Sequence, residues 1–136
     1  MSYLLDTNVC IALINGRPER VRTQFAAAVD AAHTLAVPSV VAHELWYGAA
    51  KSTRPESNAE RLEIFFAGPV EVRSFTEDDS RAAGRVRAAL ESKGQPIGAY
   101  DVLIAGQAIA RDATLVTANL KEFARIDGLA CADWTA

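Results

Sequence analysis

The stretch Tyr3-Leu4-Leu5-Asp6-Thr7-Asn8 decides the fold, because a short apolar run ends there in an acid and a polar turn. An apolar run of this length, bounded by turn residues, is typical of a buried β-strand. Asp6 at its end either bonds the backbone of its own turn or faces a ligand beyond the strand. Asp6 alone does not decide between these roles, and its neighbours in the fold must.

Further short strands alternate with segments of helical periodicity along the whole chain. We predict strands at 3–5, 34–37, 70–74, 114–117 and 129–131. We predict helices at 9–13, 20–32, 39–48, 59–66, 76–92 and 99–110, and one short helix before the last strand. Because each parallel strand pair requires a crossover, this alternation predicts an α/β fold with a mainly parallel sheet and helices on both faces.

Local signals set several boundaries of these elements. Ser39 follows the second strand, and we expect it to cap the next helix. Residues 51–58 are polar, so we expect a surface loop there. Thr76 with Asp79 three residues later resembles a capping box. The alternation at 70–74 is typical of a half-exposed strand at the edge of the sheet.

Length and composition indicate one globular domain spanning 1–136. The chain has 136 residues, of which 50% are hydrophobic and 23% charged, a balance that excludes a disordered chain. The formal net charge of −3 lacks the basic surplus that most nucleic-acid-binding proteins carry. Clustered acids that bind cations offer one reason for such a balance, since bound metal supplies positive field toward a phosphate.

The cysteines and the hydropathy pattern indicate the cellular compartment in which the protein works. Cys10 and Cys131 belong to no metal-binding spacing, and we expect two free thiols in a reducing compartment. The N-terminus has no positively charged region or signal-length apolar stretch, and no later run approaches the length of a membrane span. We therefore expect a cytoplasmic protein without a membrane partner.

Three acids are placed where a parallel α/β sheet binds ligands, beyond the carboxyl ends of its strands. Asp6 ends the first strand, whereas Asp101 lies in the first turn of an apolar helix, where it also complements the helix dipole. Asp101 shares its helix face with apolar residues three, four and seven positions later. Glu44 repeats this pattern in its own helix, so both acids border core-facing stripes.

Three carboxylates gathered at one sheet edge repel each other unless protons or cations neutralise them. Ligands that are all oxygen, without His or Cys, select a hard ion such as Mg²⁺, with Mn²⁺ as a substitute. Such ions bridge to phosphate oxygens, so Asp6, Glu44 and Asp101 predict metal-dependent phosphodiester chemistry. No side-chain nucleophile is then required.

At these residues the sequence resembles the PIN-domain family, and within it the VapC toxins of type II toxin–antitoxin systems. The resemblance spans nearly the whole chain, and its motifs share an order and spacing that are specific together. They are Leu4-Leu5-Asp6-Thr7-Asn8, Glu44-Leu45 before Gly48, Pro96-Ile97-Gly98 before Asp101 and Ile104-Ala105, Leu115-Val116-Thr117 followed by Asn119, Glu122-Phe123, Gly128-Leu129 and Asp133-Trp134.

The resemblance implies a five-stranded parallel PIN-like fold and a Mg²⁺- or Mn²⁺-dependent endoribonuclease with Asp6, Glu44 and Asp101 as catalytic, metal-binding acids. Thr7 and Thr117 match positions that support the site. Asn119 stands where the family often has a fourth acid, which leaves open whether one or two metals bind. We expect Asn119 to support the site and Glu122, one helical turn later, to be the more dispensable of the two.

The resemblance also implies partners. We expect an RNA substrate, with tRNA favoured because its loops expose unpaired bases. We further expect a homodimer and a cognate VapB-like antitoxin whose basic segment enters the acidic cleft.

Other side chains receive structural interpretations. We expect His33 in an exposed loop and His43 outside catalysis, because helix neighbours point about 100° apart. Trp46 and Tyr47 could stack on bases, but we favour packing. Residues 81–93 form the densest basic stretch, with Arg81, Arg85, Arg87 and Lys93. Such a stretch could contact phosphates, but we favour a solvated helix face.

Two alternatives belong to other function classes. A haloacid-dehalogenase-like phosphatase also starts with an apolar strand ending in Asp, but it requires a second Asp where this chain has Asn8. A non-enzymatic receiver-like binding module requires a phospho-accepting Asp after a central strand, whereas the 34–37 strand is followed by Pro38-Ser39. Metal-dependent RNA cleavage separates both alternatives from the ribonuclease.

Overall fold

The computed structural model describes residues 1–136 and contains one five-stranded sheet in the order β3-β2-β1-β4-β5. All four strand pairs are parallel. The strands are β1 (Ser2–Leu5), β2 (Thr34–Pro38), β3 (Glu71–Arg73), β4 (Thr114–Val116) and β5 (Cys131–Ala132). The predicted parallel α/β fold of five strands is therefore confirmed, with β3 at the edge of the sheet.

Seven helices connect the strands. They are α1 (Thr7–Asn15), α2 (Glu19–Asp30), α3 (Ser39–Ala50), α4 (Pro55–Phe66), α5 (Glu77–Ser92), α6 (Ala99–Ala110) and α7 (Leu120–Phe123). The predicted bounds of α6 are confirmed, and so is the capping box of α5, in which Thr76 and Asp79 each bond the backbone of the other.

Several predicted boundaries differ from the structure, and two of the differences have a clear local cause. Ser39 is the first residue of α3, not its cap, because Pro38 takes the N-cap position and no side chain bonds the helix start. The predicted loop at 51–58 is shorter, because α4 begins at Pro55. A proline lacks the N–H that the first helical position leaves unpaired, so it favours this start.

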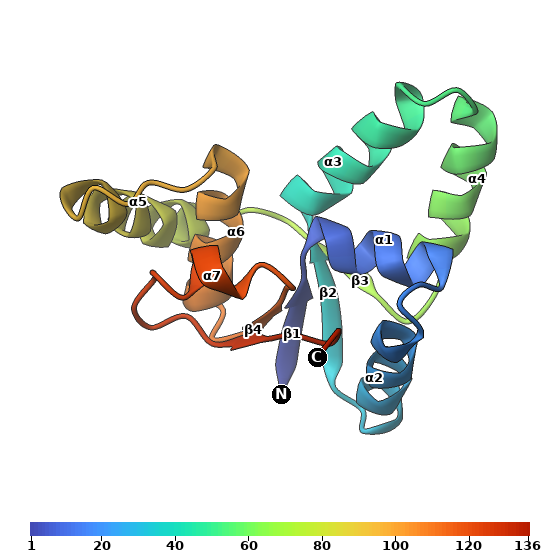
Figure 1. The fold of residues 1–136 in the computed structure, drawn as a ribbon, viewed down its shortest axis with the longest axis horizontal. Helices are drawn as coiled ribbons and strands as arrows, with labels where there is room; N and C mark the ends of the chain where they lie inside the picture. The colour runs from blue at the N-terminus through green and yellow to red at the C-terminus, as the bar shows by residue number, and fades with distance from the viewer.

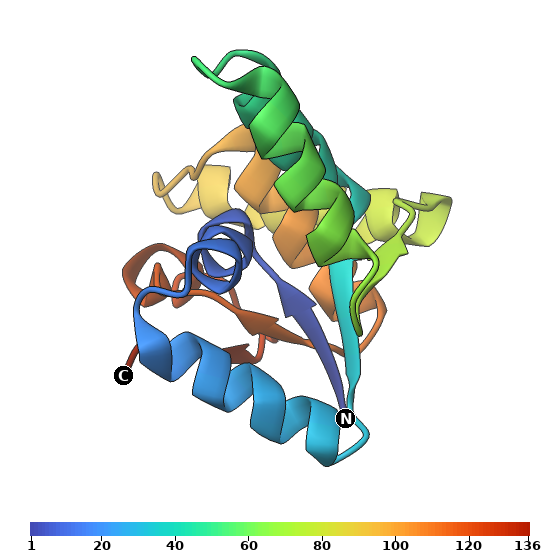
Figure 2. The ribbon, with the colours of Figure 1, turned by 90° about the vertical axis from the view of Figure 1, so that its right-hand side faces the viewer.

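The helices cover both sides of the sheet (Figures 1 and 2). In Figure 1, α5, α6 and α7 lie on one side of β1 and β4, and α1 and α2 lie on the other. The α3–α4 hairpin projects past the carboxyl end of β1. None of the helices combines the length and apolar character that crossing a membrane requires.

The two central strands carry the core and fix the site. Leu4 and Leu5 of β1 and Leu115 and Val116 of β4 are fully buried. Leu5 pairs with Val116 in the parallel register. Asp6 and Thr117, which follow these two residues, therefore lie side by side at the carboxyl ends of the central strands.

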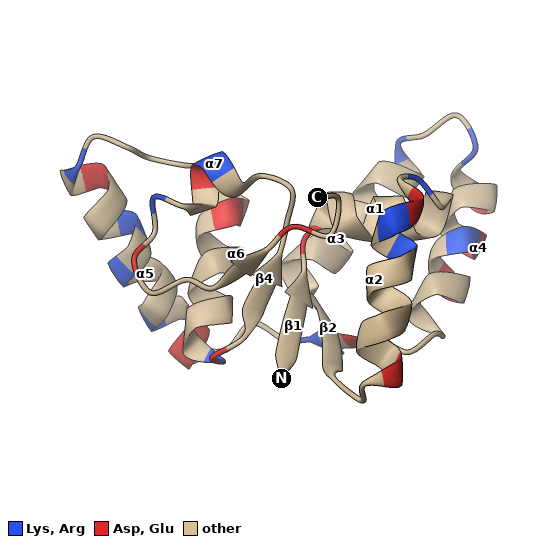
Figure 3. Cartoon of the chain, turned by 60° about the horizontal axis from the view of Figure 1, so that its bottom comes forward, with Lys and Arg blue, Asp and Glu red and all other residues tan.

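Figure 3 marks the positions of the charged residues along the chain, and several of the Lys and Arg residues belong to α5. In the 81–93 basic stretch, Arg81 pairs with Glu77 and Arg87 pairs with Glu91 within α5. Such exposed pairs contribute little to stability. The basic stretch is therefore largely a solvated helix face whose charges are locally compensated.

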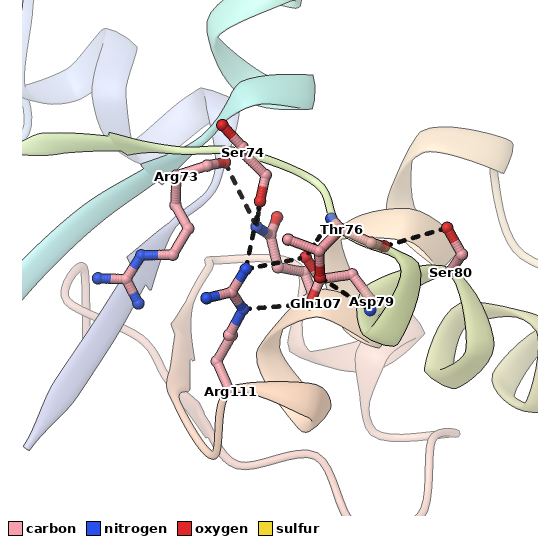
Figure 4. A network of polar contacts seen from close by, with 7 residues as sticks. All are labelled: Arg73, Ser74, Thr76, Asp79, Ser80, Gln107 and Arg111. Carbon is pink, nitrogen blue, oxygen red and sulfur yellow. Dashed lines mark hydrogen bonds and ion pairs between the residues drawn. The ribbon is translucent and has the colours of Figure 1, made fainter.

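A polar network around two buried side chains joins α5 and α6 to the end of β3 (Figure 4). Asp79 is fully buried and accepts hydrogen bonds from Arg111 at 3.2 and 3.3 Å. Gln107, also fully buried, donates to the carbonyls of Arg73 and Ser74. Although burial opposes ionisation, the Arg111 and Thr76 contacts hold the pKa of Asp79 below its usual range. This network fixes α6, and with it the position of Asp101.

Candidate active site

Asp6 is held by hydrogen bonds at both carboxylate oxygens. It is the N-cap of α1, where Oδ1 accepts from the backbone N–H of Asn8 at 2.8 Å and of Val9 at 3.3 Å. Its Oδ2 accepts from the buried Thr117 hydroxyl at 2.6 Å. Asp6 is thus a turn residue and, through its nearly buried carboxylate, a candidate ligand at the sheet edge.

Glu44 reaches the same edge from α3. It is half-buried, and its Oε1 accepts a hydrogen bond from the Thr7 hydroxyl at 3.0 Å. Thr7 directly follows Asp6 in α1, so this contact ties the α3 acid to the end of β1. The position of Thr7 agrees with the supporting role expected for it.

Asp101 completes the set from the first turn of α6. Partial burial raises its pKa to about 6, with further contributions from the charges of Glu122, Asp6 and Glu44 and from a hydrogen bond to Glu122. A carboxylate perturbed by several neighbouring acids lies within their electrostatic reach. The fold therefore brings Asp6 and Glu44 within electrostatic reach of Asp101.

Glu122 is the fourth acid of the site, although from the sequence we expected it to be the more dispensable of Asn119 and Glu122. Its Oε2 accepts from the Asn119 side chain at 3.1 Å and its Oε1 accepts from the backbone N–H of Gly98 at 3.3 Å. The Asn119 contact, together with the Gly98 and Asp101 hydrogen bonds, lowers the pKa of Glu122. The sequence signals for this role were its spacing of one turn from Asn119 and its place in the Glu122-Phe123 motif.

Asn119 and Thr117 form a continuous link between the acids. The Thr117 hydroxyl, which donates to Asp6, accepts a 3.0 Å hydrogen bond from the Asn119 backbone N–H. The Asn119 side chain in turn donates to Glu122. Asn119 therefore contacts an acid of the cluster and stands beside the site as a positioning group.

We refer to four side chains as the acidic cluster: Asp6, Glu44, Asp101 and Glu122. Their oxygen-only donor set and mutual repulsion suit a hard divalent cation. No three of them converge tightly enough to coordinate one ion together. Mg²⁺ keeps several of its waters and is bound by one or two carboxylates directly. The donor chemistry of the cluster therefore fits such an ion.

The two histidines lie outside the acidic cluster. His43 is exposed on α3, and its ring contacts Tyr100. His33 is half-buried, not exposed as predicted, because its ring packs edge-on against Tyr3 with centroids 5.6 Å apart.

The predicted packing of the α3 aromatics is confirmed for one of the two. Trp46 stacks on Phe66 of α4 with ring centroids 5.9 Å apart. Tyr47 is 58% exposed and contacts the Lys51 amine at 4.8 Å from its ring centroid. The packing prediction is therefore wrong for Tyr47.

A groove of about 350 Å³ adjoins Glu44 between α1, α3 and α4. Its apolar lining includes Ile11, which is 41% exposed, and Leu62. Arg61 lies at its rim and donates to the side chain of Asn15 at 2.9 Å. This groove offers an apolar surface next to the acidic cluster.

Residues 3–129 match the PIN domain. The chain is 41% identical to "Ribonuclease VapC2" of Rickettsia felis and 39% identical to "tRNA(fMet)-specific endonuclease VapC" of Salmonella typhimurium, with 98% of each chain covered in both comparisons. Among solved structures, it superposes with a TM-score of 0.92 and 40% identity on a chain of VapBC2 from Rickettsia felis bound to a promoter DNA fragment, covering 98% of this chain and 99% of the other.

Proposed function

The chain belongs to the PIN-domain family and is a ribonuclease of the VapC type, and we propose that its acidic cluster is the catalytic centre of a metal-dependent endoribonuclease toxin. The observation that carries the assignment is the pair of contacts at the carboxyl end of β1, where Thr117 donates to Asp6 and Thr7 donates to Glu44. The raised pKa of Asp101 is consistent with a third acid nearby. Four carboxylates at one open sheet edge cost free energy in the metal-free protein. Perturbed acids of this kind gather at functional sites, where a cation relieves the repulsion.

The cation would be Mg²⁺, or Mn²⁺ in its place, with Asp6, Glu44 and Asp101 around it. One or two of these carboxylates would bind it directly and the others through its waters. When bound, it would supply an activated water for in-line attack on the scissile phosphorus and charge stabilisation for the leaving oxygen. The chain itself contributes orientation: Thr117 aims the Asp6 carboxylate, and Thr7 aims Glu44. Such supporting hydrogen bonds fix ligand geometry before substrate arrives.

The substrate that we propose is transfer RNA. The Salmonella typhimurium relative is named for cleavage of tRNA(fMet), and it matches this chain over nearly its full length. Loops of a folded RNA present unpaired nucleotides that an open sheet edge can reach. Transfer RNA as substrate places the action of the enzyme in the cytoplasm.

The partner that we propose is an antitoxin that occupies the site while the toxin is restrained. The Rickettsia felis structure contains VapBC2. A basic segment complements the acidic cluster, and apolar side chains of the same partner fit the groove between α1, α3 and α4. We also propose that the toxin is a homodimer.

Cleavage of transfer RNA by the purified chain tests the catalytic assignment. Wild-type protein expressed without a partner should cut tRNA when Mg²⁺ or Mn²⁺ is present, and a chelator should abolish the cleavage. Sequencing the new RNA ends should reveal one preferred site. The Asp101→Asn variant, purified in parallel, should be inactive and so exclude a contaminating nuclease. Metal-independent cleavage, or equal cleavage by both proteins, would overturn the assignment.

A further inference from the structure

Two aromatic rings meet between the helices α3 and α6, which carry Glu44 and Asp101. His43 of α3 and Tyr100 of α6 lie with ring centroids 5.9 Å apart and planes inclined by 72°. Each ring directly precedes an acid of the cluster, because Glu44 follows His43 and Asp101 follows Tyr100. The pair therefore bridges α3 and α6 one residue before an acid of the cluster in each helix.

The Tyr100 ring has an open face. It is 48% exposed, although it sits in the first turn of an otherwise buried helix. An edge-to-face contact with His43 covers at most one face of the ring. By contrast, Trp46 of α3 is already stacked on Phe66. Tyr100 thus has one ring contact and keeps exposed ring surface that can accept another flat group.

The charge around the site explains why an open aromatic face matters there. The four acids repel RNA phosphates, and the chain has a net charge of −3. Affinity for RNA at this edge must therefore come in part from contacts that do not depend on charge. Stacking of unpaired bases on aromatic rings supplies such affinity, and it tolerates different bases because each has a π face.

We propose that Tyr100 is a substrate-positioning residue: an unpaired base next to the scissile phosphate stacks on its ring. The edge-on contact with His43 fixes the orientation of that ring. This inference rests on the proposed ribonuclease function and deepens it. The substrate class is RNA with an unpaired nucleotide beside the cut. A duplex without such a nucleotide would leave the ring unoccupied.

Variants of Tyr100 with matched controls test the proposal. A short RNA containing the mapped cut site is the substrate, and steady-state kinetics are measured in Mg²⁺. Tyr100→Phe keeps the stacking face and should resemble wild type. Tyr100→Ala and Tyr100→Leu should raise KM by about tenfold, within the range of one lost base stack, with a smaller change in kcat. Ile64→Ala, which removes a 70% exposed apolar side chain from α4, should change neither constant.

An abasic nucleotide in the RNA makes the test specific. Replacing the stacked base by an abasic site should raise KM in wild type about as much as Tyr100→Ala does. In Tyr100→Ala the same abasic site should add nothing, because the two changes remove one interaction. The proposal would be overturned if an abasic nucleotide raised KM equally in wild type and in Tyr100→Ala at every position flanking the cut.

Two other outcomes separate the proposal from its premises. Absence of metal-dependent cleavage by wild type would overturn the ribonuclease assignment, on which the stacking inference depends. Wild-type cleavage with normal KM in both Tyr100→Ala and Tyr100→Leu would overturn stacking alone. Light scattering measures whether each variant is still a dimer. If a variant has dissociated, and its raised KM returns to the wild-type value when the dimer re-forms at higher protein concentration, that result would also count against stacking.

Discussion

Thr117 donates a 2.6 Å hydrogen bond to the carboxylate of Asp6 across a sequence separation of 111 residues. The contact joins the carboxyl ends of β4 and β1, the two central strands. It exists because Leu5 and Val116 are register partners, so the residues after them emerge together. The fold thus orients a candidate metal ligand through the pairing of its own core strands.

Asp6→Asn should abolish cleavage and leave the fold intact. Asparagine keeps an oxygen that can cap α1 but removes the charge that a cation requires. Asp6→Ala should be equally inactive and, in addition, less stable by about 1 kcal/mol because the cap is lost. Thermal melts followed by circular dichroism give the stability, and tRNA cleavage gives the activity. Full metal-dependent activity of Asp6→Asn in a nuclease-free preparation would remove Asp6 from the site.

Thr117→Val should reduce cleavage by about 10- to 100-fold, the usual loss when a group that orients a metal ligand is removed. Valine matches the shape of threonine but cannot donate to Asp6. Thr117→Ser retains the hydroxyl and should keep most of the activity, which separates the hydrogen bond from packing. The comparison is made on kcat/KM at saturating Mg²⁺ and again in a Mg²⁺ titration. Equal activity of the Val and Ser variants would show that the contact serves stability only.

The sequence predicted the framework of the site because that framework depends on local patterns. The strands before Asp6 and Thr117 are buried apolar runs that end in polar residues, and such runs are recognisable without a structure. The face of α6 that carries Asp101 follows from helical periodicity alone. Asp6, Glu44 and Asp101 could therefore be chosen before their proximity was known.

What the sequence did not predict depends on contacts between distant segments. Glu122 meets Asp101 only because the turn at Gly98 and the short helix α7 lie side by side, as the Gly98–Glu122 hydrogen bond shows. No periodicity encodes that placement. The start of α4 was missed because its first residues are polar and its first buried apolar residue is Leu62.

Asp101→Asn should stabilise the metal-free protein at pH 7.5. The raised pKa, about 6, means that folded Asp101 holds its proton more tightly than the unfolded chain does, where the pKa is about 3.9. Stability is therefore lost as pH rises from about 4 to about 6, and the loss is complete above that range. Discounted for partial exposure, the gain for Asp101→Asn is about 1 kcal/mol, or a few degrees in Tm.

Melting curves in chelator between pH 4 and pH 8 check this prediction. The advantage of Asp101→Asn should shrink as pH falls and should reverse when Mg²⁺ is added, because only wild type gains the full benefit of the cation. Asp127→Asn, at an exposed acid paired with Lys93 on the surface, is the control and should show neither effect. A variant that is less stable than wild type at pH 7.5 in chelator would mean that Asp101 is favourably, not unfavourably, placed.

Co-expression with the adjacent small reading frame should rescue growth and give a complex that co-purifies with the toxin. Ile11→Ala should weaken that complex about 5- to 10-fold, the loss expected for truncating an apolar side chain in the groove. Ile64→Ala, outside the groove, should leave it unchanged. Both variants should still cut tRNA when expressed alone. Toxicity that no neighbouring frame relieves would count against the antitoxin, and equal affinity of both variants would count against the groove.

The last prediction ranks the two groups that stand near Asp101. Glu122 acts directly on the pKa of Asp101, whereas Asn119 contacts the cluster through its bond to Glu122 and through the Thr117 hydroxyl. These contacts favour the reverse of the order expected from the sequence, in which Asn119 mattered more. Glu122→Gln should therefore raise the Mg²⁺ concentration for half-maximal cleavage by about 10- to 100-fold. Asn119→Ala should raise it less, because it only loosens Glu122.

Metal titrations of both variants and of the double variant measure these shifts in the Mg²⁺ requirement. If Asn119 acts through Glu122, the double variant should match Glu122→Gln, since two changes on one path do not add. A larger shift for Asn119→Ala, or additive shifts in the double variant, would show that Asn119 acts on the cluster by itself.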